Sequence, residues 1–395
     1  MRTIGVVTVG RSDFGIYRPI LAAIRAAGDL QLKLFVGGAH LAPAPHGTVD
    51  EINAAGYAIA RRVEAPSCGD APLDVAHAIA GNVAGFAVAL ASDRPDLLVV
   101  LGDRYEMFAA AAAAVPLGIP LVHIHGGEVT HGAIDESFRH AITKFAHFHF
   151  AATDAAARRL RQLGEEPWRV VVSGAPSLDN LRCMSLPSWS ELAADLRLPP
   201  DERPLLVTYH PETVRHETTL GCADELLAAL NCFDVPIVIT APNADMRCRQ
   251  MRLRIQEFAA SRSQVRFCEN LGSRRYFGLM RHAAAMIGNS SSGLIEAPSF
   301  ELPVVNIGMR QGGREAAANV IHSGDGRAEI IAAIELAMSG EFRRGLVGLK
   351  NPYGDGYAAD RIVSQLQVLS LSERLMLKRF CDLQFGDATG RLEAA

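Results

Sequence analysis

DLLVVLGDRYEMFAAAAAAVPLGIPLVHIHGGEVTHGAIDESFRH, at residues 96–140, decides the fold. Two short apolar runs within it, 96–101 and 120–125, lead directly into the acidic residues Asp103 and Glu128. Open α/β sheets place their binding and catalytic groups at the carboxyl ends of such strands. The stretch therefore predicts a parallel sheet with an enzyme site at one edge.

The same alternation of apolar strands and helical patterns extends along the chain in both directions, which is typical of parallel sheets with helices on both faces. In the first half we expect strands at residues 3–9, 31–36, 57–61, 96–101, 120–125, 147–152 and 169–173. In the second half we expect them at residues 205–209, 236–240, 265–268, 283–288 and 303–307. A helix is expected at 17–27, where Ile20, Leu21 and Ile24 recur at helical spacing.

A change in composition divides the chain into two halves. Residues 181–204, LRCMSLPSWSELAADLRLPPDERP, are rich in proline and show no strand pattern, which indicates an interdomain connection with a short helix. The predicted fold is α/β, with two Rossmann-like domains facing each other across a cleft. Its segments are an N-terminal domain with the acidic residues (1–185), the connection (186–203), a C-terminal domain (204–365) and a helical tail that packs back on the first domain (366–395).

The composition argues against several classes of protein. The 395 residues are 49% hydrophobic, and 39 basic against 43 acidic residues give a net charge of -4, without the basic stripe of a nucleic-acid binder. The uncharged run at 107–127 is broken by Pro116, Gly118 and Pro120, which makes it a poor membrane span. No cleavage pattern follows the short N-terminal apolar run, so we expect a cytoplasmic protein without a membrane partner.

Metal ligation is not expected. The seven cysteines never approach CxxC spacing and are odd in number, which favours reduced thiols over disulfides or zinc. HIHGGE and HFHF contain His-x-His spacings that could suit a metal. The carboxylates and arginines at the strand ends already explain the chemistry expected in the cleft, without a metal ion.

Two glycine-bounded loops follow strands and could bind an anion. GRSDFG at 10–15 allows a tight turn beside Arg11 before a helix, although a plain turn with a solvated arginine is the alternative. It lacks the GxGxxG fingerprint, which disfavours dinucleotide binding. GNSSSG at 288–293 offers the hydroxyls of Ser290 and Ser291 as part of a phosphate cradle, although one serine could be only a helix cap.

Cationic and histidine side chains recur at other strand ends. Arg310 and Arg314 in NIGMRQGGRE could balance a diphosphate together with Arg11 and Arg104, although each alone could be a solvated charge. His210 ends the strand LLVTYH and could donate a proton to a leaving group. A structural histidine explains His210 equally well.

Four carboxylates are candidates for acid/base chemistry. Asp103 and Glu128 lie beside glycines that can admit a ligand. Asp135 and Glu136 precede the helical pattern FRHAITK and could simply cap that helix.

Nine motifs between residues 10 and 356 carry a family resemblance. They are GRSDFGIYRP, LGDRYEMF, HIHGGEVTHGAIDESFRHAITK, GAPSLDN, YHPET, PNAD, IGNSSSGLIEAPSF, NIGMRQGGRE and NPYGDG. In this order they resemble the hydrolysing UDP-N-acetylglucosamine 2-epimerases, bacterial sialic-acid-pathway enzymes that are also similar to the epimerase half of the bifunctional animal enzyme. The resemblance implies a GT-B-like fold, a homo-oligomer (dimer or tetramer), and a UDP-sugar in the cleft without a metal or nicotinamide cofactor. It also implies the conversion of UDP-N-acetylglucosamine and water to N-acetylmannosamine and UDP.

The resemblance implies a role for each candidate residue. Asp103, Glu128 and Asp135 would carry the acid/base steps, with Glu136 in reserve, and His210 would stabilise the leaving group. The substrate-binding residues would be Arg11, Arg104, Ser290, Ser291 and Arg314 at the diphosphate, Glu296 at the uridine ribose, and Asn243 near the sugar.

Three alternatives stay open. The motifs do not define the groups on carbons 4 and 6, and close relatives act on 2,4-diacetamido-2,4,6-trideoxy sugars on the way to legionaminic acid. A GT-B glycosyltransferase would instead pass the sugar to an acceptor. A catalytically silent UDP-sugar sensor would bind the nucleotide without turning it over.

Overall fold

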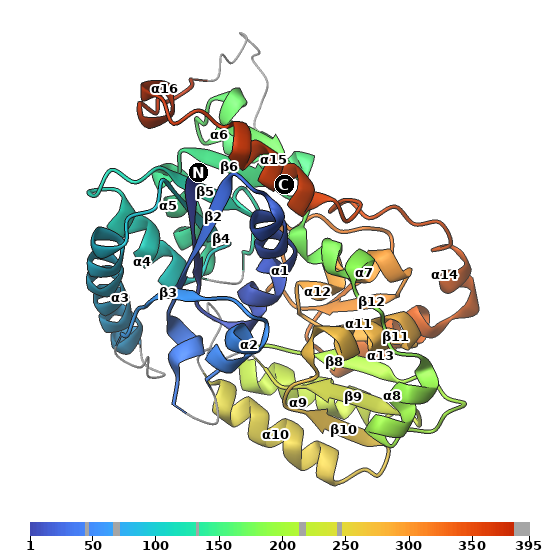
Figure 1. Cartoon of the computed structure of the whole chain (residues 1–395). Helices are drawn as coiled ribbons and strands as arrows, with labels where there is room; N and C mark the ends of the chain where they lie inside the picture. Colours follow the sequence, from blue (N-terminus) through green and yellow to red (C-terminus); the bar gives the residue numbers. More distant parts are fainter. Residues whose placement is uncertain (44–46, 66–71, 132–133, 213–218, 243–246, 383–395) are drawn as a thin grey trace.

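Two parallel sheets flanked by helices form the frame of the molecule, and they lie side by side (Figure 1). The computed structural model describes residues 1–43, 47–65, 72–131, 134–212, 219–242 and 247–382. The seven-stranded sheet has the order β3-β2-β1-β4-β5-β6-β7, and the six-stranded sheet has the order β10-β9-β8-β11-β12-β13. The predicted α/β fold with two parallel-sheet domains is confirmed.

The first domain alternates strands and helices along the chain. Its strands are β1 (Arg2–Thr8), β2 (Leu30–Val36), β3 (Ile59–Arg62), β4 (Leu97–Leu101), β5 (Leu121–Ile124), β6 (Phe148–Ala151) and β7 (Val170–Val172). Its helices are α1 (Arg11–Ala26), α2 (Val49–Ala54), α3 (Pro72–Ser92), α4 (Tyr105–Ala114), α5 (Asp135–Phe145), α6 (Asp154–Gln162) and α7 (Asp179–Cys183). Every residue of β4 and β5 is buried, as expected for central strands with helices on both faces.

The second domain repeats the pattern, and two further helices end the described chain. Its strands are β8 (Leu205–Thr208), β9 (Ile237–Thr240), β10 (Val265–Cys268), β11 (Ala285–Gly288), β12 (Val304–Ile307) and β13 (Val320–Ser323). The helices are α8 (Trp189–Leu196), α9 (Thr219–Leu230), α10 (Cys248–Ala260), α11 (Gly272–His282), α12 (Ser292–Ile295), α13 (Arg327–Met338), α14 (Gly340–Arg344), α15 (Ala358–Val368) and α16 (Glu373–Met376).

Two elements differ from the prediction. The sequence VIHS of β13 was not expected to be a strand, because this partly exposed edge strand has no continuous apolar run. Helix α1 begins at Arg11, so most of GRSDFG is helical and not a loop. The buried Asp13 carboxylate explains this start, because it accepts hydrogen bonds from the Val9 N–H (2.7 Å) and the Thr8 hydroxyl (2.8 Å) just before the helix.

The proline-rich connection contains α8, which packs on the second domain. Ser188 and Glu191 form a reciprocal capping box that defines the start of this helix. Leu192 and Leu196 are buried in one apolar cluster with Leu206 of β8. The connection is therefore part of the packing of the second sheet.

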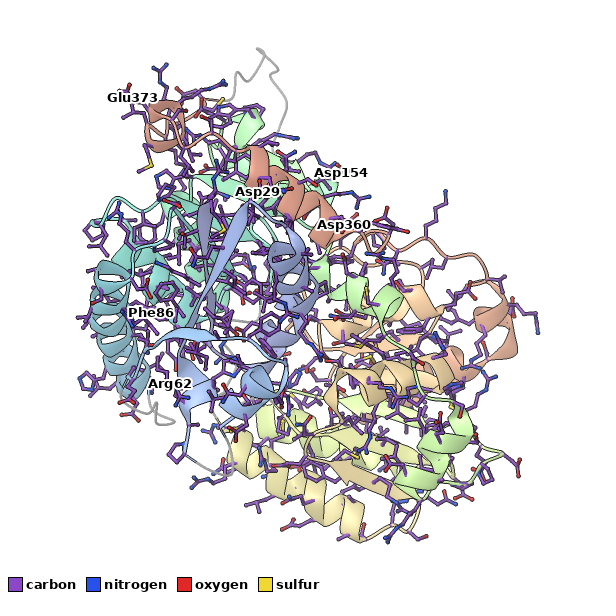
Figure 2. The ribbon with its side chains drawn as sticks, in the orientation of Figure 1. Asp29, Arg62, Phe86, Asp154, Asp360 and Glu373 are labelled. Carbon is purple, nitrogen blue, oxygen red and sulfur yellow. The ribbon has the colours of Figure 1, made fainter. Side chains whose placement is uncertain are left out.

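The chain returns to the first domain at α15, which lies over the first sheet in Figure 1. Ile362 and Leu366 belong to the core of that sheet. Gln367 donates a hydrogen bond to Asp29 (2.8 Å), which Figure 2 labels beside the same helix. The return therefore begins before residue 365, where we placed the end of the second domain from the sequence.

Among the described residues, α3 is the one helix that is long and apolar enough to cross a membrane. Its apolar character also serves packing, because Phe86 and Leu90 lie in the core of the first domain. Figure 2 labels Phe86 on this helix.

Residues 372–381, here called the C-terminal strap, are anchored by two cationic side chains. The fully buried Arg169 guanidinium donates to the carbonyls of Leu375 (2.8 Å) and Arg374 (2.8 Å). The Lys378 ammonium donates to the carbonyl of Ala146 (2.7 Å) at the end of α5 and pairs with the buried Glu165 (2.7 Å). The strap is thus tied to the first sheet by hydrogen bonds from charged donors, which are stronger than neutral ones.

Replacing Arg169 with methionine is expected to lower the free energy of unfolding by at least about 3 kcal/mol, because several buried carbonyls lose their donor. Urea denaturation measures this loss. The matched control is Arg374→Met, which removes an exposed arginine that stacks 4.5 Å from the Trp168 ring centroid. That control should cost about 1 kcal/mol or less. Equal losses in both variants would contradict the anchoring role.

Candidate active site

Asp103 and Glu128 meet at the carboxyl edge of the first sheet. Strands β4 and β5 are parallel neighbours, with Leu101 in register with Ile124, so the residues that follow them emerge at the same edge. The Arg139 side chain links the two loops. It pairs with the Asp103 carboxylate and donates to the main-chain carbonyl of Glu128 (2.9 Å).

The Glu128 carboxylate is almost fully enclosed and joins the two domains. One oxygen pairs with Arg314 of the second domain at 2.7 Å, and the other accepts a hydrogen bond from His125 Nδ1. Only 4% of the side chain is exposed. A cavity of about 260 Å³, lined by residues of both domains, opens beside the ion pair.

Both carboxylates are held in the ionised form. Burial favours the neutral acid, but the opposing charges of Arg139 and Arg314 outweigh it and lower the pKa of Asp103. Burial opposes ionisation of Glu128 as well, and Arg314 and His125 bring the pKa of Glu128 well below its usual range. The edge therefore presents two anions that are balanced by buried cations.

Asp135 and Glu136 begin helix α5 but differ in their surroundings. Asp135 is its first residue, partly buried and one turn before Arg139. The Glu136 carboxylate accepts a hydrogen bond from the Thr130 N–H and pairs with His140 (3.4 Å). Those contacts tie the start of the helix to the loop that contains Thr130.

Three loops of the second domain are joined at the facing edge. Asn289, fully buried after β11, accepts a hydrogen bond from the His210 N–H (2.7 Å) and donates to its carbonyl (2.9 Å). Gln311, after β12, donates to the Asn289 carbonyl (2.9 Å). Burial, with a smaller contribution from Arg310, lowers the pKa of His210 well below its usual value, so this imidazole is neutral at pH 7.

The serine loop requires the glycine before it. Gly288 has φ 137°, and a side chain there would place its Cβ 2.0 Å from the Thr208 carbonyl oxygen. Ser290 and Ser291 follow, both partly exposed, and the Ser292 N–H donates to the Ser290 hydroxyl (3.4 Å). Two hydroxyl groups are thus presented at the edge of the second sheet.

Glu296, directly after α12, is a buried carboxyl near the domain junction. Burial raises its pKa to about 7, although Ser177 of the first half and His125 favour the charged form. Its protonation therefore changes in the physiological pH range.

The remaining candidates are more dispersed. Arg11 is exposed at the first turn of α1, and Arg104 precedes α4 and pairs with the buried Glu106 (3.2 Å). Asn243 lies outside the described residues. The structure thus brings together Asp103, Glu128, Arg314 and Glu296 at the junction, with His210 and the serines on the facing edge. Within the described ranges, no group of three or more metal-ligating side chains is present.

Sequence reasoning missed three contributors to this arrangement: Arg139, His125 and Asn289. Arg139 stands alone in an ordinary helical pattern, four residues after Asp135, and that i, i+4 spacing is the one signal that marks it. His125 was considered only as half of a His-x-His metal spacing, and Asn289 lies in a loop that was singled out for its serines. Their importance comes from contacts between loops, which spacing in one chain segment does not show.

Comparisons with known proteins identify the family. The family model for UDP-N-acetylglucosamine 2-epimerase matches residues 22–367. A Legionella pneumophila protein named UDP-N,N'-diacetylbacillosamine 2-epimerase (hydrolyzing) is 33% identical over 386 residues, 96% of this chain and 99% of its own. A Campylobacter jejuni protein named GDP/UDP-N,N'-diacetylbacillosamine 2-epimerase (hydrolyzing) is 35% identical over 82% of this chain and 84% of its own.

A solved structure shows that the fold is shared. The crystal structure of UDP-GlcNAc 2-epimerase from Neisseria meningitidis bound to UDP-GlcNAc superposes with a TM-score of 0.80 over 93% of this chain and all of that one, at 20% identity. The two-domain architecture is therefore GT-B-like. The chain belongs to the hydrolysing UDP-N-acetylglucosamine 2-epimerase family and is a UDP-sugar 2-epimerase of the hydrolysing type.

Proposed function

We propose that this enzyme converts a UDP-activated 2-acetamido sugar and water to UDP and the free sugar inverted at carbon 2. The observation that carries the proposal is the ion pair between Glu128 and Arg314 across the domain junction, beside Asp103. It puts acid/base groups of one domain next to a cation of the other. Elimination of a diphosphate needs both kinds of group at one place.

The chemistry explains why carboxylates and arginines are needed together. The hydrogen on carbon 2 is not acidic, so inversion there is easiest when UDP leaves carbon 1 as a base removes that proton and a glycal forms. Water then adds at carbon 1, and an acid returns a proton to the opposite face of carbon 2. Two proton-transfer groups are therefore required, one on each face of the sugar ring.

We assign the proton transfers to the group formed by Asp103, Glu128 and Asp135. The neutral His210 would donate a hydrogen bond to the departing phosphate. The diphosphate would be held by Arg11, Arg104, Ser290, Ser291 and Arg314, with Glu296 at the ribose and Asn243 near the sugar.

The substrate is one of two related UDP-sugars. The sequence motifs favoured UDP-N-acetylglucosamine, with the 2,4-diacetamido-2,4,6-trideoxy sugar second. The names of the relatives at 33% and 35% identity support the diacetamido sugar, because the first is named a 2-epimerase for UDP-N,N'-diacetylbacillosamine and the second for its GDP or UDP form. We therefore propose the diacetamido sugar as the preferred substrate and a place in the biosynthesis of a nonulosonic acid.

The test is to incubate the enzyme with each UDP-sugar in deuterated water and follow the products by proton NMR. Free 2-epimer with deuterium at carbon 2, formed without any acceptor, is the expected result. A glycosyltransferase would need an acceptor, and a sensor would release no sugar. Unlabelled product would exclude elimination and re-addition, and comparison of kcat/KM for the two sugars identifies the substrate.

The affinity for UDP is expected to rise between pH 6 and pH 8. The buried Glu296 has a pKa of about 7, and its ionised form accepts hydrogen bonds from the two ribose hydroxyls more strongly than the neutral acid does. Calorimetric titration at both pH values measures the change. Glu296→Gln should bind UDP more weakly. After the ionisation of the UDP phosphate is subtracted, the affinity of this variant should show little remaining pH dependence. An unchanged pH profile in that variant would remove Glu296 from the ribose site.

A further inference from the structure

We propose that His125 is the base that removes the carbon 2 proton, and that Glu128 is its positioning residue. This inference rests on the proposed epimerase function. It assigns a catalytic role to a residue that the motif comparison passed over, and it changes the role of Glu128 from base to partner of the base.

The hydrogen bond between His125 and Glu128 determines which ring nitrogen is free. An ionised carboxylate can only accept, so His125 Nδ1 must carry the hydrogen that it shares with Glu128. In the neutral ring, Nε2 then holds a lone pair. Among the described residues Nε2 is buried and has no hydrogen-bond partner. Buried polar atoms are usually paired, so this nitrogen is available to accept a proton from a bound ligand.

The backbone of His125 is held in an unfavourable conformation. Its φ of 65° lies in the left-handed region, which a residue with a side chain seldom adopts. The residue follows the last residue of β5, and its N–H still donates to the Phe150 carbonyl of the neighbouring strand (3.0 Å). Strain of this kind persists at sites where the direction of a side chain matters.

The charged groups around His125 come from both domains. Glu128 contacts it from its own loop, and the other oxygen of Glu128 pairs with Arg314 of the second domain (2.7 Å). The His125 ring therefore lies at the domain junction, one contact away from the Glu128–Arg314 ion pair.

Glu128 is poorly suited to remove the proton itself. Both of its oxygens are engaged, one with His125 and one with Arg314, and the side chain is 4% exposed. Its low pKa also makes it a weak base. A carboxylate that orients and stabilises an adjacent imidazolium is a recurrent arrangement in enzymes that use histidine as a base.

The elimination moves one proton to His125 and releases UDP. Nε2 takes the proton from carbon 2, and the electron pair of that C–H bond becomes the double bond between carbons 1 and 2. The C1–O bond breaks, and UDP leaves with its electron pair. The imidazolium, stabilised by Glu128, later returns its proton to solvent, while water and a second acid complete the addition.

His125→Asn tests the proton transfer. Asparagine tolerates a positive φ and can still donate to Glu128, so folding and UDP affinity should stay within about threefold of wild type. It cannot accept a proton, and kcat should fall by at least about 100-fold. A variant that keeps more than a tenth of wild-type kcat would show that His125 only holds Glu128 in place.

His125→Gly separates a missing base from a distorted site. Glycine adopts the positive φ without strain and leaves room for added imidazole. Imidazole should raise the rate of this variant by at least about tenfold over its rate without imidazole. The control is His131→Gly, an exposed histidine of the same loop, whose rate should be near wild type and insensitive to imidazole. No rescue, with UDP binding intact, would overturn the assignment. If wild type binds UDP but turns over neither UDP-sugar, the proposed function itself has failed.

Discussion

Asp103→Asn is expected to lower kcat by about 10³-fold, while UDP affinity changes by less than about threefold. Asparagine keeps the size and the oxygen acceptor for Arg139 but loses the negative charge. Arg139 and Arg314 keep the pKa of Asp103 low despite burial, so the site has charges arranged to maintain this anion. An acid/base step that uses Asp103 cannot proceed through an amide. Steady-state turnover and calorimetric binding of UDP measure the two quantities.

The matched control for Asp103 is Glu136→Gln. Glu136 also lies beside Arg139, at 3.6 Å, so this variant removes a neighbouring charge from the same guanidinium. Its carboxylate is engaged at the start of α5 and is not required for proton transfer in the proposed mechanism. We expect kcat within about tenfold of wild type, since an i, i+3 helix pair contributes little. Equal loss in both variants would mean that the charge balance at Arg139 matters more than the Asp103 carboxylate.

The meeting of Asp103 and Glu128 was predictable because it follows from topology. Two apolar runs separated by a helical segment form neighbouring parallel strands, and such strands end at the same edge of the sheet. The residues after them must then lie close together. The second sheet obeys the same logic, which places His210 beside the loop that contains Asn289 and the serines.

The charge partners were not predictable in this way. Arg314 and Glu128 are far apart in sequence and in different domains, so only the packing of the domains pairs them. The left-handed φ of His125 depends on tertiary contacts, because nothing in the local pattern HIHGGE requires it. The start of α1 was misplaced for a related reason. The Asp13 carboxylate accepts a hydrogen bond from the Val9 N–H, and this buried contact, which the sequence pattern does not show, stabilises the first turn of the helix.

Arg314→Met is expected to reduce both stability and UDP affinity. The substitution leaves Glu128 buried without its cation, and breaking a buried pair from one side typically costs about 3–5 kcal/mol of unfolding free energy. The same guanidinium is proposed to bind the diphosphate, so the affinity for UDP should fall by about 100-fold. Urea denaturation and calorimetry measure these losses. Arg310→Met is the control for the loop, because Arg310 follows the same strand and contacts the Asn289 carbonyl (3.2 Å) without pairing with Glu128.

The pH dependence of stability shows whether the buried, unpaired charge of Glu128 causes the loss of unfolding free energy in Arg314→Met. In wild type the folded pKa of Glu128 lies below the ordinary glutamate value of 4.5, so its contribution to stability is fully present above pH 4.5 and is lost only on acidification. Without Arg314, burial raises that pKa above the unfolded value, and stability is then lost as pH rises. The deficit of Arg314→Met should therefore be larger at pH 8 than at pH 5. Adding Glu128→Gln should recover much of the deficit at pH 8, because no unpaired charge remains. A deficit that is independent of pH, and not recovered in the double variant, would mean that Arg314 stabilises the junction through packing and not through the ion pair.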